Sequence, residues 1–436
     1  MQQLSAYIAS AMRRPLPPAV TEKTKHHLLD TLAAMVSGSR LLPGKTAISY
    51  VKTLGGSKEA CVIGSRCVTT AINAALANGM LAHADETDDS HAPSLCHPGC
   101  AIVPAALAMA EREQRNGTAL LRAVALGYDV GCRINLSLNA YEFREDGHST
   151  HSFGPMFGAA AAAGALAGLN AARTRHLLSY TAQQASGVSC WMRDEEHIEK
   201  AFDFGGMPAR NGVTAATMVA HGFTGVDDAF SGERNFFVAY GRAPQPAELT
   251  RDLGSAYEIM NTNIKRWSVG SPIQAPLDAL EIMLKKKPFE ADQVREVVIR
   301  MTPGSVVDNR EMPDVCIQHM IAVMLIDKTA TFRSAHDKPR MKDPAILRQR
   351  AKVRLEPGAG RPLVVVTLMD GTRLSEDVTA VLGTLSNPMT RDQVVAKCRE
   401  LMAPVLGASA SAKLIERTLS LENVNNIRDL RPLLQK

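Results

Sequence analysis

The stretch FGAAAAAGALAGL, residues 157–169, consists almost entirely of alanine and glycine. In a helix these residues present nothing larger than a methyl group over most of the surface, so a neighbouring helix can approach unusually closely. Glycine lowers helix propensity, and close packing is the compensation that would keep it in such a segment. We therefore expect these residues to form the central helix of a bundle.

The sequence on either side of this segment is also helical in pattern. In TKHHLLDTLAAMVSG, residues 24–38, apolar side chains recur at positions i, i+3 and i+4, and Gly38 is a typical helix stop. The runs TAINAALANGMLAHA (70–84) and AIVPAALAMAEREQRNG (101–117) repeat this pattern. Together they predict an all-helical domain over residues 1–257.

A second pattern, of β-branched runs, follows the helical one. Strands are predicted at REVVIRM (295–301), AKVRLEP (351–357) and PLVVVTLMDGTRLSEDV (362–378), the last with a hairpin turn at Asp370-Gly371. These runs predict a smaller α+β unit over residues 258–385.

The helical period returns after this unit. Thr390 and Gln393 form a capping box at the start of a helix, so we expect residues 386–436 to rejoin the helical domain. The predicted fold class is therefore mainly α, with a large all-helical domain and a smaller α+β lid domain inserted before the C-terminal helices.

Composition narrows the class of protein. At 436 residues the chain is longer than most single cores, which stop growing near roughly 250 to 300 residues. A net charge of +5, without a long basic block, argues against nucleic acid and suits a small anionic substrate. The chain has no apolar region of signal-peptide type and no span for a bilayer, and its eight cysteines contain no CxxC pair. We expect a cytoplasmic protein that makes no membrane contact.

The polar stretch HADETDDSHAPSLCHPGC, residues 83–100, contains three histidines, four carboxylates and two cysteines. Its histidines and cysteines are competent metal ligands, but their spacing matches no zinc signature and no HExxH motif is present, so we predict no metal. A solvated polar loop between two helices is the other reading of this composition.

The position of His97 favours an active site. Pro98 and the apolar run after it place His97 at the amino end of a helix, where the dipole disfavours a charged imidazole and favours a substrate carboxylate. The four carboxylates of residues 85–89 have the opposite effect, because they raise the pKa of any histidine beside them and of whichever carboxylate is most buried. Opposed environments of this kind give one site both an acid and a base.

Two later segments also place histidines or cationic side chains near the amino end of a helix. In EDGHSTHSFGPMFGAA, His148 and His151 precede the small-residue helix, again at its amino end. In DEEHIEKAFDFGGMPARNGVTAA, Lys200 and Arg210 flank a double glycine that opens the next helix, an arrangement suited to a carboxylate. Taken alone, each segment would equally fit a solvated loop.

In this order, the segments resemble the MmgE/PrpD family, which includes 2-methylcitrate dehydratase, cis-aconitate decarboxylase and iminodisuccinate epimerase. The resemblance covers nearly the whole chain and implies the two-domain fold predicted above, no cofactor, and a homodimer. It rests on six segments in register: NGMLAHADETDDSHAPSLCHPG, LGYDVGCRI, HSFGPMFGAAAAAGALAGL, KAFDFGGMPARNG, IKRWSVGSPIQAPLDAL and NPMTRDQVVAKCRELMAPVLG.

The resemblance also implies roles for individual residues. Glu86 falls at the acidic active-site position, Ser90 at the hydroxyl position beside it, and His97 at the histidine of the His-Pro pair. Lys200 matches the lysine that opens the Lys-x-x-x-x-Gly motif. Each of these four residues is therefore expected at the active site.

The next family histidine has two candidates. His148 matches it by its spacing to Gly154, and His151 is a rival because this sequence carries one extra residue before Gly158. We assign His148 to proton transfer and His151 to substrate binding.

Two positions depart from the family pattern. Gln274 stands where a histidine is usual, and His319 stands where a tyrosine is common. Since glutamine cannot transfer a proton at neutral pH, either Gln274 only orients other groups or the chemistry has moved elsewhere. His319 is the nearest candidate by motif, and the pair would then be a compensated exchange on the lid. Both changes also fit a different substrate that needs an amide donor and a smaller ring.

The function that the resemblance implies is a cofactor-independent lyase acting on a small di- or tricarboxylate, with a 2-methylcitrate-type dehydration as the leading reaction. Decarboxylation of the cis-aconitate type or epimerisation would use nearly the same groups, and a non-enzymatic helical binding protein is the alternative from another class. The expected catalytic residues are His97, His148, Glu86 and Lys200, and the expected substrate-binding residues are Ser90, His151, Arg210, Lys265, Gln274 and His319.

Overall fold

The computed structural model describes residues 1–302 and 307–436, which divide into two compact units. The helical unit comprises Met1–Ala84, Asp88–Ile264 and Thr390–Lys436, and the α+β unit comprises Asp85–Thr87 and Lys265–Met389. Apart from the short segment Asp85–Thr87, the chain crosses between the units at 264/265 and 389/390, whereas the sequence predicts boundaries at 257/258 and 385/386. The mainly α fold that the sequence predicts is confirmed.

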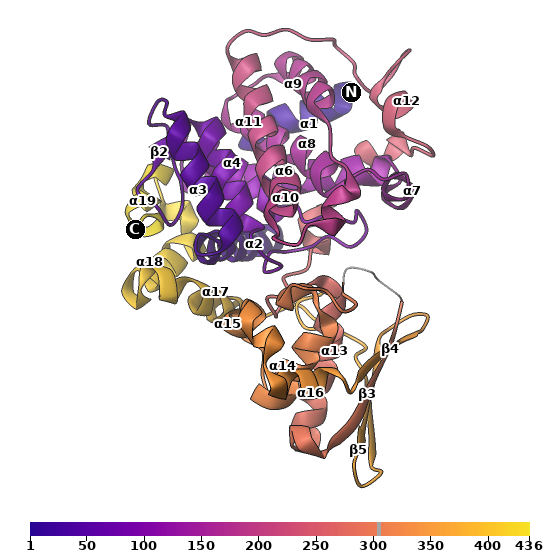
Figure 1. The fold of residues 1–436 in the computed structure, drawn as a ribbon. Helices are drawn as coiled ribbons and strands as arrows, with labels where there is room; N and C mark the ends of the chain where they lie inside the picture. The colour runs from indigo at the N-terminus through magenta and orange to yellow at the C-terminus, as the bar shows by residue number, and fades with distance from the viewer. Residues whose placement is uncertain (303–306) are drawn as a thin grey trace. The chain divides into compact units, whose positions relative to one another are not determined.

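The helical unit is a bundle in which the C-terminal helices α17 and α18 pack on α2 (Figure 1). Its only strands among the described residues are two short ones that pair antiparallel. The elements are α1 (Gln2–Ser10), α2 (Pro18–Gly38), α3 (Leu42–Leu54), β1 (Ala60–Cys61), β2 (Val68–Thr69), α4 (Ala71–Ala82), α5 (Gly99–Arg112), α6 (Gly117–Ser137), α7 (Ala140–Glu145), α8 (Thr150–Leu166), α9 (Ala171–Gln184), α10 (Ile198–Ala201), α11 (Met207–Ala220), α12 (Phe236–Tyr240), α17 (Arg391–Leu406), α18 (Ala408–Leu419) and α19 (Arg431–Leu434).

The small-residue segment forms most of α8, which packs against α5, α6, α9 and α11 at the centre of the bundle. Its glycines meet the backbone of α6 directly. A Cβ atom at Gly154 would lie 2.5 Å from the carbonyl oxygen of Gly131, and one at Gly158 would collide with the carbonyl oxygen of Gly127. The close approach expected from the sequence is therefore a backbone-to-backbone contact between α8 and α6.

Gly38 ends α2, as the sequence predicts, but the reason is packing. Its φ angle is not in the left-handed region, so it is not a conformational stop. A Cβ atom at this position would collide with the carbonyl oxygen of Leu81 in α4. Gly38 is therefore required where two helices meet.

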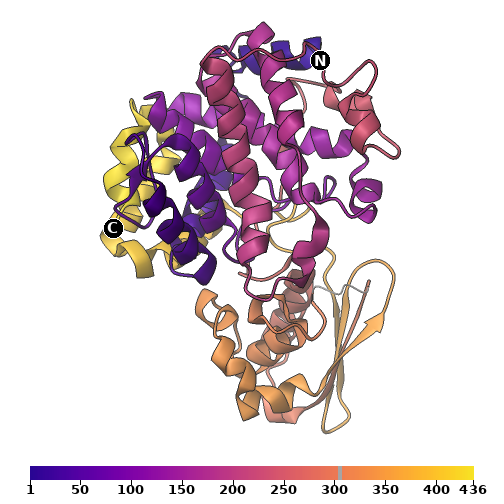
Figure 2. The same ribbon diagram turned by 45° about the horizontal axis from the view of Figure 1, so that its top comes forward.

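The α+β unit contains a four-stranded sheet in the order β4-β3-β5-β6, in which β3 and β4 are parallel and the other pairs antiparallel. Helices α13, α14 and α16 lie on one face of this sheet (Figures 1 and 2). Gly371, with a φ of 87°, forms the predicted hairpin turn. The elements are α13 (Ser271–Lys286), β3 (Val294–Met301), α14 (Ile317–Asp327), α15 (Phe332–Ala335), α16 (Pro344–Arg350), β4 (Val353–Pro357), β5 (Leu363–Leu368) and β6 (Arg373–Asp377).

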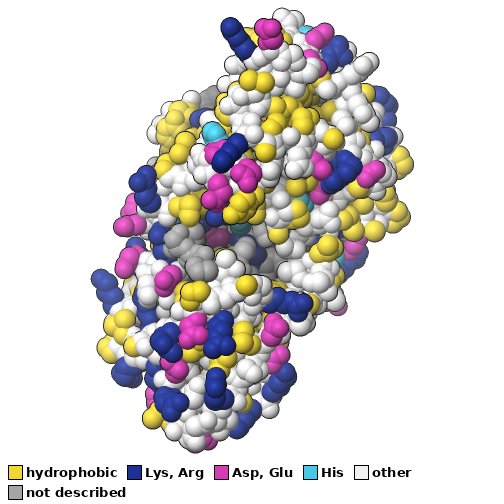
Figure 3. Space-filling view, turned by 90° about the vertical axis from the view of Figure 1, so that its right-hand side faces the viewer, with side chains coloured by type: hydrophobic (Ala, Val, Ile, Leu, Met, Phe, Trp, Pro, Cys, Tyr) yellow, Lys and Arg dark blue, Asp and Glu magenta, His cyan; other side chains and the backbone are white. Residues whose placement is uncertain are grey.

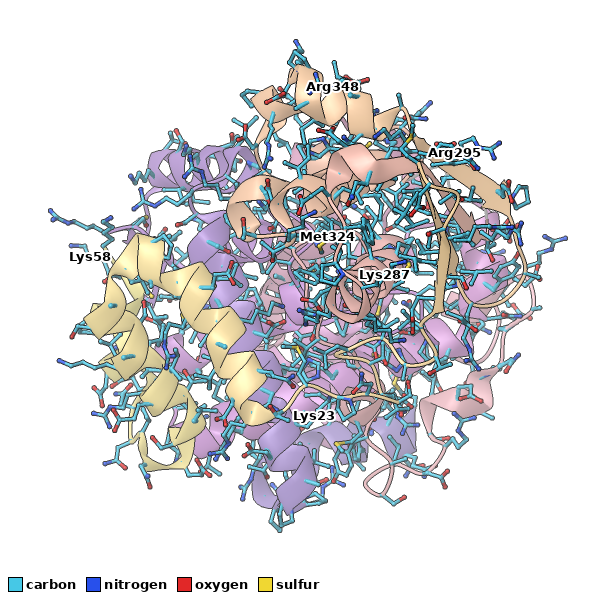
Figure 4. All side chains as sticks on the ribbon, turned by 90° about the horizontal axis from the view of Figure 1, so that it is seen from below. Lys23, Lys58, Lys287, Arg295, Met324 and Arg348 are labelled. Atoms are coloured by element: carbon cyan, nitrogen blue, oxygen red, sulfur yellow. The ribbon has the colours of Figure 1, made fainter. Side chains whose placement is uncertain are left out.

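The side chains of the α+β unit separate into an apolar interior and a charged exterior. Figure 4 shows Met324 of α14 inside the unit, where it is fully buried, and Arg348 on the outer side of α16. On the face drawn in Figure 3, basic and acidic side chains are interspersed, so the described residues form no continuous basic surface there. Among the described residues, no helix is long and apolar enough to cross a bilayer.

The contact between α6 and α8 predicts that Gly158→Ala destabilises the protein. The new methyl group would press on the Gly127 carbonyl, and overpacking of this kind costs about 1 to 3 kcal/mol, which exceeds the gain of roughly 0.5 to 1 kcal/mol from replacing a helical glycine by alanine. The free energy of unfolding in urea measures the difference. Gly164→Ala on the same helix is the control, because its methyl group meets the flexible end of Leu177. Equal effects of the two substitutions would contradict the prediction.

Candidate active site

A buried carboxylate, Asp88, holds two histidines of the helical unit. Its Oδ1 lies 3.0 Å from Nδ1 of His83 and 3.2 Å from Nδ1 of His97. Burial would raise the pKa of the Asp88 carboxyl, but the two imidazoles more than offset burial and hold that pKa well below its ordinary value. Because an ionised carboxylate only accepts hydrogen bonds, each ring presents Nδ1–H to Asp88, and Nε2 is the atom suited to proton transfer.

The loop that carries these groups joins two helices. His83 is the residue after the last turn of α4, and His97 directly precedes Pro98, the N-cap residue of α5. Pro98 thus lies at the start of the helix and His97 at its entrance, as expected from the sequence. The neighbouring carboxylate, Asp89, accepts a hydrogen bond of 3.0 Å from the backbone N–H of Gly99, which fastens the loop to the first turn of α5.

Asp89 is itself held by two buried side chains. His27 Nδ1 lies 2.6 Å and the Tyr128 hydroxyl 2.5 Å from its Oδ2. Burial lowers the pKa of His27 to about 4, so this imidazole is neutral and donates from Nδ1. Burial, together with the charge of Asp89, raises the pKa of Tyr128 well above its ordinary value. Asp89 is therefore a structural anchor, fixed by three donors next to Asp88.

One aromatic ring, Phe204 in the π-helical turn η3 (Phe202–Gly206), lies among the histidines. It stacks on His151 with ring centroids 3.7 Å apart and on His83 with centroids 4.2 Å apart. The His97 ring lies 5.2 Å from both His83 and His151. Phe204 therefore packs three imidazoles into one cluster.

Lys200 adds a positive charge to this cluster. Its Nζ lies 5.2 Å from the centre of the Phe204 ring and 5.4 Å from that of Trp191, and the residue is buried. The backbone N–H of Lys200 donates to Asp194, which fixes the start of α10. A buried ammonium group over aromatic rings, beside imidazoles, can stabilise negative charge that develops on a substrate.

The structure brings His151, and not His148, to the cluster. His148 stacks on Phe143 with centroids 4.5 Å apart and meets the edge of Tyr240. It precedes α8, and its backbone pairs with that of Val188. His151 lies in the first turn of α8, beside His97. The geometry therefore favours His151 over His148 for proton transfer.

Three further residues of the cluster, His197, Phe204 and Trp191, could hardly be predicted as site residues from the sequence. His197 is buried, and its ring lies 5.1 Å from that of His83. The histidine stands three residues before Lys200, and that spacing is the one hint available. Phe204 and Trp191 give none, since aromatic residues in a helical pattern are usually core.

Two predicted substrate-binding residues of the helical unit make other contacts. The guanidinium of Arg210 lies over the ring of Phe202 at 5.6 Å, and its Nε donates to Asn211. Ser90 exchanges backbone hydrogen bonds with Asn263. These contacts are with partners other than the histidines, so neither residue is needed to build the cluster.

The α+β unit holds the segment Asp85–Thr87 by two ion pairs. Lys265 Nζ lies 2.9 Å from the backbone carbonyl oxygen of Glu86 and 3.2 Å from its carboxylate. His336 Nε2 lies 3.0 Å from Asp85. Glu86 and Lys265, both predicted as site residues, are therefore buried partners of each other.

Two further predicted residues are buried inside the α+β unit. The amide of Gln274 makes three hydrogen bonds to the backbone of Trp267 and Val269. His319 lies in α14, and neither of its ring nitrogens has a hydrogen-bond partner among the described residues. The expectation that both contact substrate stays a prediction.

The ligand atoms of His83, Asp88 and His97 lie within 4.8 Å of one another, so this group could hold a metal ion. In the structure, the nitrogens of His83 and His97 lie 3.0 and 3.2 Å from Oδ1 of Asp88, within the range of hydrogen bonds. The expectation that the protein needs no metal stays a prediction.

Comparison with models of known protein families gives two matches. A model of the MmgE/PrpD N-terminal domain matches residues 2–249, and a model of the MmgE/PrpD C-terminal domain matches residues 267–423. The chain belongs to the MmgE/PrpD family. Membership supports an enzyme of the dehydratase or lyase type.

The ion pair between Asp85 and His336 makes stability depend on pH. Burial opposes the charged imidazole, but Asp85 outweighs burial and raises the pKa of His336 to about 9. A histidine in the unfolded chain has a pKa of about 6.5. The folded state thus binds this proton more tightly, so the stabilisation is complete below about pH 6.5 and is lost as the pH rises through about 9.

We expect His336→Gln to lower the free energy of unfolding by about 3 kcal/mol below pH 6.5 and by much less above pH 9. Urea unfolding between about pH 5.5 and pH 9.5 measures the difference from the original protein. His221→Gln, at an exposed position, is the control for loss of a histidine. A difference that stays constant over this range would show that the ion pair does not determine the effect.

Proposed function

We propose that the protein is a cofactor-independent lyase that removes a proton next to a carboxylate of a small di- or tricarboxylate, with 2-methylcitrate-type dehydration as the leading reaction. The observation that carries the proposal is the arrangement of His97, oriented by ionised Asp88, beside His151 and Lys200. Family membership supports the reaction class. The substrate is inferred from the resemblance of the motifs.

The chemistry needs a base, an acid and a fixed cation. Removing a proton next to a carboxylate places extra negative charge on that carboxylate, and the Lys200 ammonium would stabilise it. In the dehydration, one imidazole of the pair His97 and His151 takes the carbon-bound proton. The carbon–oxygen bond then breaks, the other imidazole gives a proton to the departing hydroxyl, and water and a carbon–carbon double bond result.

Asp88 supports these proton transfers because its carboxyl group stays ionised. A carboxylate that accepts Nδ1–H from His97 stabilises the imidazolium formed when Nε2 takes a proton, and it fixes the tautomer of the neutral ring. Glu86 and Lys265 are proposed as a further acid and a further carboxylate-binding cation, as the family motif implies.

Proton exchange with solvent tests the proposal directly. Purified protein, treated with a chelator, is incubated in D2O with a panel of hydroxy and unsaturated di- and tricarboxylates, and NMR follows loss of the proton next to each carboxylate. We expect exchange and elimination with a 2-methylcitrate-type substrate. Release of carbon dioxide or inversion alone would indicate decarboxylation or epimerisation. The proposal would be rejected if none of the compounds in the panel exchanged a proton, or if activity required stoichiometric metal.

The two rival histidines allow a matched comparison. We expect His151→Gln to lower kcat at least ~100-fold, the usual scale for losing a positioned acid or base. His148→Gln replaces a ring that stacks on Phe143 outside the cluster, and we expect it to change kcat by less than about threefold. Steady-state kinetics of both variants on the same substrate give the measurement. A larger loss for His148→Gln would return the proton-transfer role to His148.

Lys200→Met should act on the transition state. If Lys200 stabilises the charge that develops on the substrate carboxylate, its loss raises the activation free energy by about 3 to 4 kcal/mol, the cost of removing an oxyanion donor, and kcat falls accordingly. KM should change little. The comparison of kcat with KM decides the role, because a rise in KM alone would make Lys200 a ground-state carboxylate clamp.

A further inference from the structure

A polar cavity of about 910 Å³ lies in the helical unit, lined by η1 (Ala11–Arg13) and by the segments that open α6 and α9. Three of its lining residues are arginines: Arg13, Arg115 and Arg122. None of the described residues that line it is an aspartate or a glutamate, and none belongs to the histidine cluster. The cavity therefore concentrates positive charge with no acidic side chain to offset it.

Two of the arginines are fixed by backbone carbonyl groups. Arg115 Nε donates to the carbonyl oxygen of Leu166 at 2.8 Å, and Arg122 Nη1 donates to that of Met12. A guanidinium has five N–H donors, and each of these bonds uses one. In the described part of the chain, no carboxylate forms an ion pair with either group. The arginines are thus held in place with most of their donors available to a ligand.

The backbone adds to the positive potential. The α6 and α9 helices both begin at the cavity, where Thr118, Ala119 and Ala171 are among the lining residues. Helices of 21 and 14 residues carry a partial positive charge at their amino ends. Side-chain cations and helix ends therefore act in the same direction.

We propose that this cavity binds a small polyanion carrying carboxylate or phosphate groups, at a site distinct from the histidine cluster. Guanidinium groups recognise both kinds of anion through paired N–H donors. The volume lies in the range of small-molecule sites. A polyanion here would connect η1 to the first turn of α6 and to the end of α8, since Arg115 binds the carbonyl of Leu166, the last residue of α8.

The test uses the full chain with two probes, inorganic pyrophosphate and citrate, titrated in a calorimeter at constant ionic strength. The decisive variant is Thr118→Glu, which places a carboxylate in the lining. Because a negative charge is favourable in the first turn of a helix, this variant should remain folded. Thr118→Gln is the size-matched neutral control. We expect one-to-one binding of at least one probe, weakened at least tenfold by Thr118→Glu and less than about threefold by Thr118→Gln.

The two probes distinguish the source of the anion: tighter pyrophosphate binding indicates a phosphate ligand and tighter citrate binding a carboxylate ligand. Amide hydrogen exchange locates the site, and we expect protection at residues 114–119 and 165–171. Failure of both probes to bind, or equal weakening by the two Thr118 variants, would overturn the proposal. Protection confined to residues 95–100 and 198–206 would also overturn it, by assigning the anion to the histidine cluster. None of these outcomes depends on the proposed lyase activity.

Discussion

The backbone contact between α6 and α8 is the constraint on which the helical unit depends. Glycines on both helices bring the two backbones into direct contact, so a Cβ atom at Gly154 or Gly158 would collide with a carbonyl oxygen of α6. This fixed pair carries the supports of the site. Asn135 on α6 donates to the carbonyl oxygens of Ser94 and Thr150, at 3.0 and 2.7 Å, and so joins the loop before His97 to the first residue of α8.

Two adjacent buried carboxylates show how the site keeps a charge inside a protein. An unpaired carboxylate in the interior would be neutralised by a proton. Asp89 is held by donors that stay neutral or belong to the backbone, and its role ends with that anchorage. Asp88 instead meets two imidazoles, groups that can themselves take a proton. Burial is thus compensated at Asp88 by two imidazoles, one of which, His97, is proposed to take part in the proton transfer.

Much of the fold was predictable because its signals are local. The capping box at Thr390 and the hairpin at Gly371 form as expected, since each depends on a few neighbouring residues. The position of His97 at the entrance of α5 follows from Pro98 in the same way. Local chemistry is sufficient for such features, and motif resemblance is sufficient for the family.

The choice between His148 and His151 was not predictable from spacing. It depends on where α8 begins, and that point is set by tertiary contacts. The backbone N–H of Ser149 donates to the carbonyl of Gly187, and its hydroxyl donates to Asp203 in η3. These partners lie far along the chain. The central ring, Phe204, was missed for the same reason, because only the packing of η3 places it between histidines.

The two departures from the family pattern fit a structural explanation better than an exchange of chemistry. Gln274 supplies one acceptor to the N–H of Trp267 and two donors to the carbonyls of Trp267 and Val269. A neutral imidazole has one donor and one acceptor, so it could not replace all three bonds. Gln274 therefore orders the loop that follows Lys265, which is the orientation role considered for it.

His319 is equally unsuited to the role of a compensating acid. Burial, followed by the charges of Arg350 and Arg340, lowers its pKa to about 4, so the ring stays neutral near pH 7. An imidazole with that pKa holds no proton to give to a leaving group at neutral pH. The residues left for the proposed proton transfer are His97, whose imidazolium ionised Asp88 would stabilise, and His151, whose ring lies beside that of His97.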